Sequence, residues 1–252
     1  MDIEQLQSQV REEVTNLLMK EYNLSPNVLA TSDIPEKLEH SMLGQDITRE
    51  KILKESALAK QYGVAAICVS PYYVPAAFSV LYGTRTAVCA AIGFPQGAMS
   101  HEAKLAEIRA CTNAGATELD IALNMLAVKS GEYDVARREL CEEVAVAGIR
   151  ARVKAVFEHA SYTDEEKKIV LAMVAESGAE FIKIQNMTSG HGARVEDVAF
   201  VRSQIGDSVK IKIDGGVKTL ETARALLSAG ADRIGLTATE AVAKEALGCS
   251  RF

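Results

Sequence analysis

The chain has 252 residues, of which 48% are hydrophobic and 25% charged, proportions typical of a soluble globular protein with a sizeable core. Its formal net charge of −6 argues against nucleic acid or an anionic membrane surface as a partner. No apolar run approaches the roughly 20 residues that a membrane span needs, and the N-terminus carries acidic residues early, unlike a signal peptide. We therefore expect a cytoplasmic protein that binds neither nucleic acid nor membrane.

Residues 1–20 place apolar side chains at helical spacing, and a linker with two prolines follows. We expect residues 1–35 to form an N-terminal helix and linker, serving as a cap on the main domain or as a dimer contact. Residues 36–252 show no linker that would divide them, so we expect them to form a single domain.

From residue 36 onward the chain alternates short apolar runs with longer helical stretches. The predicted strands cover residues 37–43, 64–69, 85–92, 117–122, 149–157, 181–184, 209–213 and 232–236. The predicted helices cover residues 48–62, 75–82, 100–114, 132–147, 163–177, 195–205, 219–229 and 239–247. Eight strand–helix units of roughly 25 to 30 residues favour an α/β fold of the (β/α)8 TIM-barrel type over a doubly wound sheet.

Lys183 is the residue in this pattern that most clearly indicates chemistry. It lies in the apolar run 181–184, which predicts a strand buried on both faces. Lysine is rarely fully buried, burial disfavours its charged form, and a neutral amine attacks carbonyl groups. Lys183 is therefore a candidate Schiff-base nucleophile. The alternative is that its side chain reaches the surface or pairs with a carboxylate.

Other polar residues interrupt the predicted strands, and strand ends carry the active sites of such barrels. Lys212 and Asp214 share one face of their strand because strand side chains alternate. Two neighbouring lysines would lower each other's pKa, and a carboxylate nearby could shuttle protons. The alternative is an internal salt-bridge cluster, formed by Lys154, Lys183, Lys212, Asp120 and Glu39. The four scattered histidines and five widely spaced cysteines lack the spacing of a metal site, so we expect no metal.

Residues 36–239 resemble the class I deoxyribose-phosphate aldolases through an ordered set of segments. The first four are Leu-Glu-His-Ser at 38–41, Ala-Ile-Cys-Val-Ser-Pro at 66–71, Ile-Gly-Phe-Pro-Gln-Gly at 92–97 and Ala-Gly-Ala-Thr-Glu-Leu-Asp at 114–120. The others are Val-Lys-Ala-Val-Phe-Glu at 153–158, Gly-Ala-Glu-Phe-Ile-Lys at 178–183, Val-Lys-Ile-Lys-Ile-Asp-Gly-Gly-Val at 209–217 and Gly-Ala-Asp-Arg-Ile-Gly at 230–235.

The resemblance implies an aldehyde-lyase that performs reversible aldol cleavage, as in deoxyribonucleotide catabolism. By position, Lys183 matches the Schiff-base lysine, Lys212 the second lysine that perturbs it, and Asp120 the proton-relay aspartate. Acetaldehyde or another short aldehyde or ketone would be the donor. No cofactor or metal is implied, because the iminium is the electron sink. We also expect a homo-oligomer, with a dimer as the expected form.

The sequence departs from the family where the acceptor's phosphate would bind. Glu39 and Ser41 replace an aspartate and a threonine, Gln185 follows the lysine, and Asp214 precedes the diglycine. Asp214 would repel a phosphate unless a cation pairs with it. Residues 237–240 resemble a capping box, which would occupy the amides of the last helix. The expected substrate-binding set is Glu39, Ser41, Cys68, Lys154, Gln185, Gly190, Asp214, Gly215, Gly216 and Thr237.

Two other functions stay open at this point. One is an imine-forming carbon–carbon lyase that acts on a different sugar or keto acid. The other is a non-catalytic relative that binds a sugar phosphate, although a binder need not keep Lys183, Lys212 and Asp120 together. Cys68 has its own alternative, a small buried side chain without a role in the site.

Overall fold

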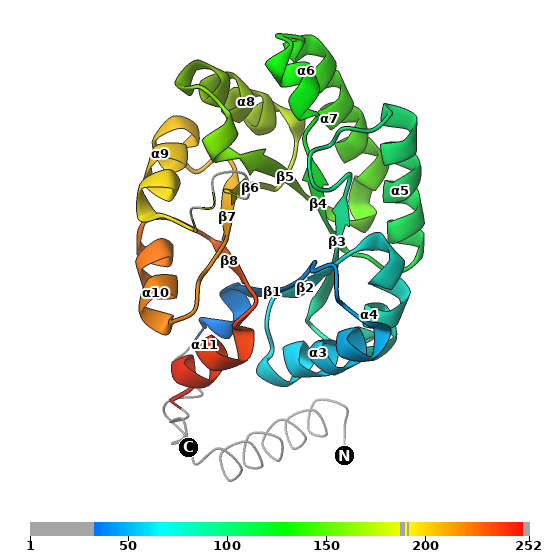
Figure 1. Cartoon of the computed structure of the whole chain (residues 1–252), viewed down its shortest axis with the longest axis vertical. Helices are drawn as coiled ribbons and strands as arrows, with labels where there is room; N and C mark the ends of the chain where they lie inside the picture. Colours follow the sequence, from blue (N-terminus) through cyan, green and yellow to red (C-terminus); the bar gives the residue numbers. More distant parts are fainter. Residues whose placement is uncertain (1–32, 187–189, 191, 249–252) are drawn as a thin grey trace, which may run out of the picture.

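The computed structural model describes residues 33–186, 190 and 192–248, and it contains a closed barrel of eight parallel strands. The strands follow one another in sequence order, and the last pairs with the first (Figure 1). Figure 1 looks into the ring of strands, with the helices arranged around it. The predicted (β/α)8 TIM barrel is confirmed. The expected helix at 1–20 lies outside the described residues.

The strands are β1 (Leu38–Met42), β2 (Ala66–Val69), β3 (Ala87–Ile92), β4 (Glu118–Ala122), β5 (Arg152–Glu158), β6 (Phe181–Gln185), β7 (Lys210–Asp214) and β8 (Arg233–Leu236). The helices are α3 (Arg49–Tyr62), α4 (Val74–Leu81), α5 (His101–Asn113), α6 (Met125–Lys129), α7 (Tyr133–Ala147), α8 (Asp164–Ser177), α9 (Val195–Ile205), α10 (Leu220–Ser228) and α11 (Thr239–Ala246). Short 3₁₀ turns are η1 (Pro35–Lys37), η2 (Pro71–Tyr73), η3 (Gly148–Arg150) and η4 (His159–Ser161). Among the described residues, none of the helices has the length and apolarity to cross a membrane.

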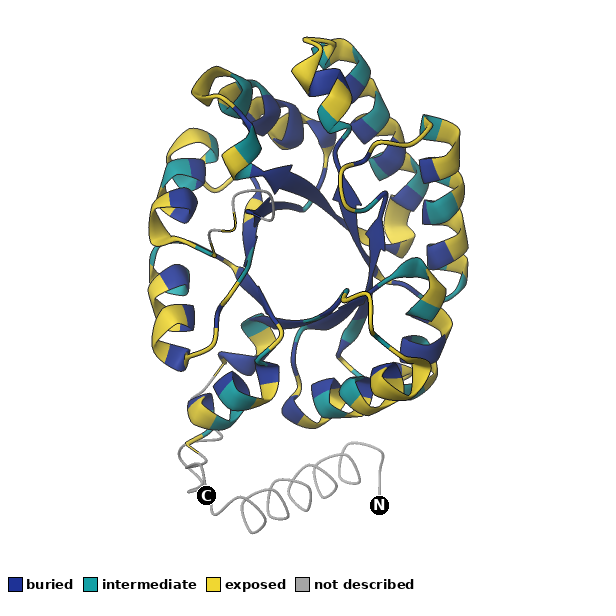
Figure 2. Ribbon diagram, viewed as in Figure 1, coloured by how far each residue is buried: buried dark blue, intermediate teal, exposed yellow. Residues whose placement is uncertain are grey.

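The helices cover the outer face of the barrel and bury it. Figure 2 shows the strands almost entirely in the colour of buried residues, whereas the helices alternate buried inner and exposed outer positions. Parallel strands that are buried on both faces appear in the sequence as continuous apolar runs. These runs predicted the strands. Gly115, Gly178 and Gly230 each follow a helix and have positive φ, so the chain repeats one helix-to-strand turn at these places.

The structure differs from the alternation predicted from the sequence at two places in particular. The predicted strand 149–157 begins too early, because η3 precedes β5 and Ile149 is fully exposed rather than buried. The short helix α6 was not predicted at all. Asn124 caps it by accepting a hydrogen bond from the backbone N–H of Ala127 at 3.1 Å. A five-residue helix is too short to show helical periodicity, so its cap was the available signal.

Candidate active site

Lys183 lies in the middle of β6 with its side chain inside the barrel and no exposed surface. Its Nζ is 2.8 Å from Oδ2 of Asp120 on β4 and 2.7 Å from Oδ2 of Asp214 on β7. The ring of Phe94, in the loop after β3, has its centroid 5.0 Å from the same nitrogen. The candidate nucleophile therefore sits between two carboxylates and beside an aromatic ring, and it does not reach the surface.

The second lysine, Lys212, is brought beside Lys183 by strand register. The two residues are paired neighbours in the ladder between β6 and β7. Lys212 Nζ is 2.7 Å from Asp120 Oδ2, contacts Glu39, and lies 3.6 Å from Asp214 Oδ1. One oxygen of Asp120 thus bridges both lysines.

The expected internal cluster is present and extends further down the barrel than the sequence indicated. Lys154 contacts Asp120 at 3.1 Å and Glu39 at 3.4 Å. It also contacts Glu118 at 2.7 Å, and Arg233 pairs with both Glu118 and Glu39. Sequence reasoning missed Glu118 and Arg233. For Glu118 the signal was available, because it lies two residues before Asp120 on β4 and therefore shares its face.

The lysine cluster, defined as Lys154, Lys183, Lys212, Arg233, Glu39, Glu118, Asp120 and Asp214, is balanced in charge. Four cations face four carboxylates within the described barrel interior. Barrel interiors are ordinarily filled by branched apolar side chains. Ion pairs in place of apolar side chains require every charge to be removed from water, which offsets the gain from pairing. The cluster therefore indicates a functional site rather than a source of stability.

Lys212 lowers the pKa of Lys183 as expected, but the neighbouring carboxylates outweigh this effect. Burial and the charge of Lys212 lower the pKa of Lys183, but Asp120 and Asp214 raise it more, so it lies above its usual value. Burial raises the pKa of Asp120, while Lys154, Lys183 and Lys212 hold it well below its usual range. Lys183 and Asp120 are therefore both ionised at rest, and Lys183 must give up a proton before it can attack a carbonyl group.

A cavity of about 220 Å³ opens at the carboxyl ends of the strands, where barrel active sites lie. It is lined by Ser41, Leu43, Gln185, Asn186, Asp214, Gly215, Gly216, Gly235, Leu236 and Thr237. Six of the expected substrate-binding residues therefore share one cavity. Two buried oxygens there, Ser41 Oγ and Asp214 Oδ1, lack a hydrogen-bond partner among the described residues.

The other expected substrate-binding residues lie elsewhere. Glu39, Cys68 and Lys154 are completely buried deeper in the barrel, and the thiol of Cys68 lies 3.6 Å from Asp120 Oδ2. Gly190 is exposed in the loop after β6, and it does not line the cavity. The rest of that loop, residues 187–189 and 191, lies outside the described residues.

The predicted capping box at 237–240 is wrong. Helix α11 begins at Thr239, after Ala238, and no side chain caps its start. Thr239 instead lies 2.7 Å from Nδ1 of His40, and Glu240 pairs with Lys244 at 2.9 Å along the helix. No side chain therefore caps the backbone N–H groups at the start of α11, beside Thr237. These groups remain available to bind an anion.

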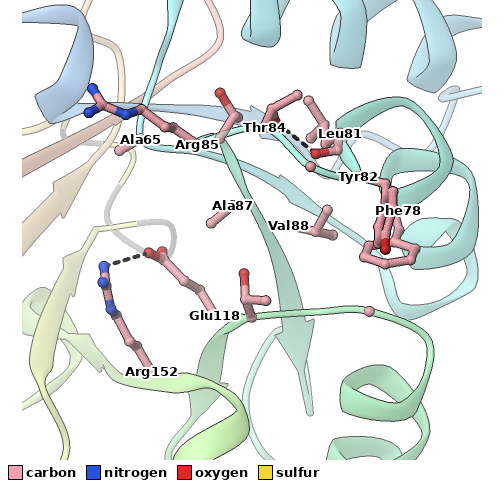
Figure 3. A pocket seen from close by; sticks show the side chains of 14 residues that line it. Ala65, Phe78, Leu81, Tyr82, Thr84, Arg85, Ala87, Val88, Glu118 and Arg152 are labelled. Atoms are coloured by element: carbon pink, nitrogen blue, oxygen red, sulfur yellow. Dashed lines mark hydrogen bonds and ion pairs between the residues drawn. The ribbon is translucent and has the colours of Figure 1, made fainter. Parts of the chain in front are cut away.

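A larger cavity of about 410 Å³ lies at the opposite end of the barrel, where β2 to β5 begin. Figure 3 shows Arg152 reaching Glu118 there, at 3.4 Å. Its size does not make it the active site, since neither Lys183 nor Lys212 lines it. Catalytic groups of this fold lie at the carboxyl ends of the strands.

Known proteins resemble this chain over most of its length. It is 38% identical over 217 residues to a deoxyribose-phosphate aldolase of Thermoanaerobacter pseudethanolicus, covering 84% of this chain and 96% of the relative. It is 38% identical over 204 residues to that of Geobacillus sp. (strain WCH70), covering 81% and 92%. The chain belongs to the deoxyribose-phosphate aldolase family. It is therefore an enzyme, a lyase of the aldolase kind.

Solved structures agree with this family. The aldolase described as "QR15, an Aldolase" has a TM-score of 0.81 at 32% identity, over 86% of this chain and 96% of that one. The deoxyribose phosphate aldolase from Aeropyrum pernix, described as having a unique tetrameric structure, has a TM-score of 0.78 at 25% identity, over 84% and 90%. The family described as "Histidine biosynthesis protein" matches residues 139–249, less than half of the chain, so this match does not change the assignment.

Proposed function

We propose that this protein is a class I aldolase in which Lys183 forms the Schiff base, with Lys212 and a neighbouring carboxylate as its catalytic partners. The observation that supports this most is the buried contact of Lys183 with Asp120, which Lys212 shares. The family resemblance assigns the proton relay to Asp120. A lysine without exposed surface but within reach of two carboxylates can exchange protons while water is excluded.

The reaction begins when the neutral amine of Lys183 attacks the carbonyl carbon of a short donor aldehyde or ketone. Loss of water gives an iminium, and a base removes a proton from the adjacent carbon to form an enamine. The enamine carbon attacks the acceptor aldehyde, whose oxygen takes up a proton, and water then releases the product and Lys183. Cleavage is the same sequence in reverse. The ring of Phe94 lies where it can stabilise the cationic iminium, since its face attracts cations.

The acceptor would occupy the cavity above the cluster. Backbone amides at Gly215 and Gly216, with the uncapped start of α11, offer a site for a phosphate. Asp214 is paired with Lys183 and Lys212, so its charge is offset and need not repel that phosphate. Ser41 Oγ and Asp214 Oδ1 have no hydrogen-bond partner among the described residues, which favours an acceptor that also carries hydroxyl groups. A sugar phosphate or a hydroxylated aldehyde fits this lining.

Reductive trapping tests the proposal. Incubation with acetaldehyde and borohydride should add one ethyl group to Lys183, located by peptide mapping. Lys183→Met should abolish the adduct, whereas Lys210→Met should not, because Lys210 is exposed at the amino end of β7 and pairs with Glu180 at 2.8 Å. If the wild type gives no adduct at Lys183 with any short aldehyde or ketone, the Schiff-base proposal fails. Cleavage of deoxyribose 5-phosphate then distinguishes this substrate from a different sugar or keto acid.

We also propose that the chain forms a homo-oligomer, a dimer being the expected form, with residues 36–252 as the aldolase domain and 1–35 as a cap or dimer contact. Light scattering of the full chain and of a variant lacking residues 1–32 tests both statements. An unchanged dimer after the truncation would exclude the dimer contact, and a monomer in both samples would exclude the oligomer.

A further inference from the structure

The cavity at the amino ends of the strands has a cationic side and an aromatic side. Figure 3 shows the side chains of Arg85 and Arg152 on one side of it and those of Phe78 and Tyr82 on the other. Its volume of about 410 Å³ falls within the range of small-molecule sites, which is about 300–1,000 Å³. A cavity of this size that combines apolar walls with a few charged groups is typical of a ligand site.

The two arginines of this cavity are only weakly paired with carboxylates. Arg85 lies 3.6 Å from Glu36, and its side chain is 89% exposed. Arg152 lies 3.4 Å from Glu118 and 3.5 Å from Glu180, and its side chain is 56% exposed. A guanidinium group that binds a carboxylate strongly does so at about 2.7–2.9 Å. Since arginine has five N–H donors, both side chains keep donors for an anion that enters the cavity.

The carboxylate of Glu118 does not exclude an anion from this cavity. Among the described residues that line it, those that carry charge are Arg85, Glu118 and Arg152. Glu118 is 2% exposed, and its Oε2 contacts Lys154 at 2.7 Å and also Arg233. Two cations of the lysine cluster therefore offset this one carboxylate. The two arginines remain as an excess of positive charge on the lining.

The other side of the cavity offers an apolar surface with an exposed aromatic ring. The ring centroids of Phe78 and Tyr82 lie 5.5 Å apart, with an angle of 72° between the ring planes. Tyr82 is 77% exposed although it lines the cavity. Ala65, Leu81 and Val88 complete this wall. Because aromatic side chains pack against other rings, stacked or edge to face, this side suits a planar ring.

We propose that this cavity is a second ligand site, which binds a small anion that carries a planar ring. Arg85 and Arg152 bind the anionic group through charge-assisted hydrogen bonds, and the ring packs against Tyr82 and Phe78. A nucleoside monophosphate and a simple aryl phosphate share this chemistry. The site lies at the end of the barrel opposite the active-site cavity, so it does not depend on the Schiff-base function proposed for Lys183.

Calorimetric titration of the full chain tests this site, with adenosine monophosphate and phenyl phosphate as the probes. The affinity for the tighter probe should fall about tenfold or more in Arg85→Met and in Arg152→Met, because each variant loses charge-assisted hydrogen bonds. Tyr82→Ala should also weaken the binding of the probe, because it removes the exposed ring. Arg150→Met is the matched control, since Arg150 is exposed, contacts Asn113 at 2.8 Å and does not line the cavity.

The remaining probes and controls decide the outcome. Adenosine lacks the anion and inorganic phosphate lacks the ring, so both should bind more weakly than the tighter probe. The proposal is overturned if neither probe binds, if inorganic phosphate binds as tightly as they do, or if both arginine variants keep the wild-type affinity. Binding that survives in both variants belongs to the cavity beside Lys183 instead. Circular dichroism checks the fold, and the exposed Arg85 carries the test if Arg152→Met does not fold.

Discussion

Replacing Arg233 with methionine tests whether the lysine cluster is held together by its charge balance. Arg233 is 8% exposed and contacts Glu118 and, at 3.4 Å, Glu39. Without it, three cations face four carboxylates inside the barrel. Breaking a buried ion pair typically destabilises a protein by about 3–5 kcal/mol. We expect the lower end of this range, because Glu118 keeps its contacts with Lys154 at 2.7 Å and Arg152 at 3.4 Å.

Urea unfolding followed by circular dichroism measures this change. Arg85→Met is the matched control, since Arg85 is exposed and its contact with Glu36 is 3.6 Å, and such surface changes stay within about 0.5 kcal/mol. The double variant Arg233→Met/Glu118→Gln restores charge balance, so its destabilisation should fall short of the sum of the single variants by about 1–3 kcal/mol. Additive single variants, or an Arg233→Met protein as stable as the control, would refute the argument from charge balance.

Two further predictions concern the site. Burial raises the pKa of Glu39, but Lys154 and Lys212 lower it more, to about 2 against 4.5 for an ordinary glutamate. The ionised Glu39 therefore contributes to stability above pH 4.5, and this contribution is lost as the pH falls from there towards 2. The stabilities of wild type and Glu39→Gln should converge over this range in acid unfolding titrations. Parallel curves would contradict this. Gly235→Ala should displace Asp214 from Lys183 and Lys212, because the added Cβ would lie 1.6 Å from Asp214 Oδ1, and should lower kcat. An unchanged kcat would show that Asp214 keeps its place or that its contacts do not matter for the reaction.

The sequence by itself determined the barrel and the identity of its unusual strand residues. Strands buried on both faces leave short apolar runs, and helices with one buried face leave a helical period. Both patterns are local, so the strand–helix units could be predicted from the sequence. Side-chain alternation is equally local, and it placed Lys212 and Asp214 on one face correctly. Where the pattern was short, as in α6, or where an apolar residue was exposed, as at Ile149, local reasoning failed.

Only the tertiary structure decided which charges meet and what they do to one another. Asp120 is 63 residues from Lys183 and 92 from Lys212, and barrel closure brings all three together. The pKa of Lys183 depends on the sum of burial, two carboxylates and one lysine, and the sequence shows none of these distances. The sequence could therefore name the candidate lysine. Its resting charge, and the carboxylates that set this charge, follow from contacts between strands far apart in the chain.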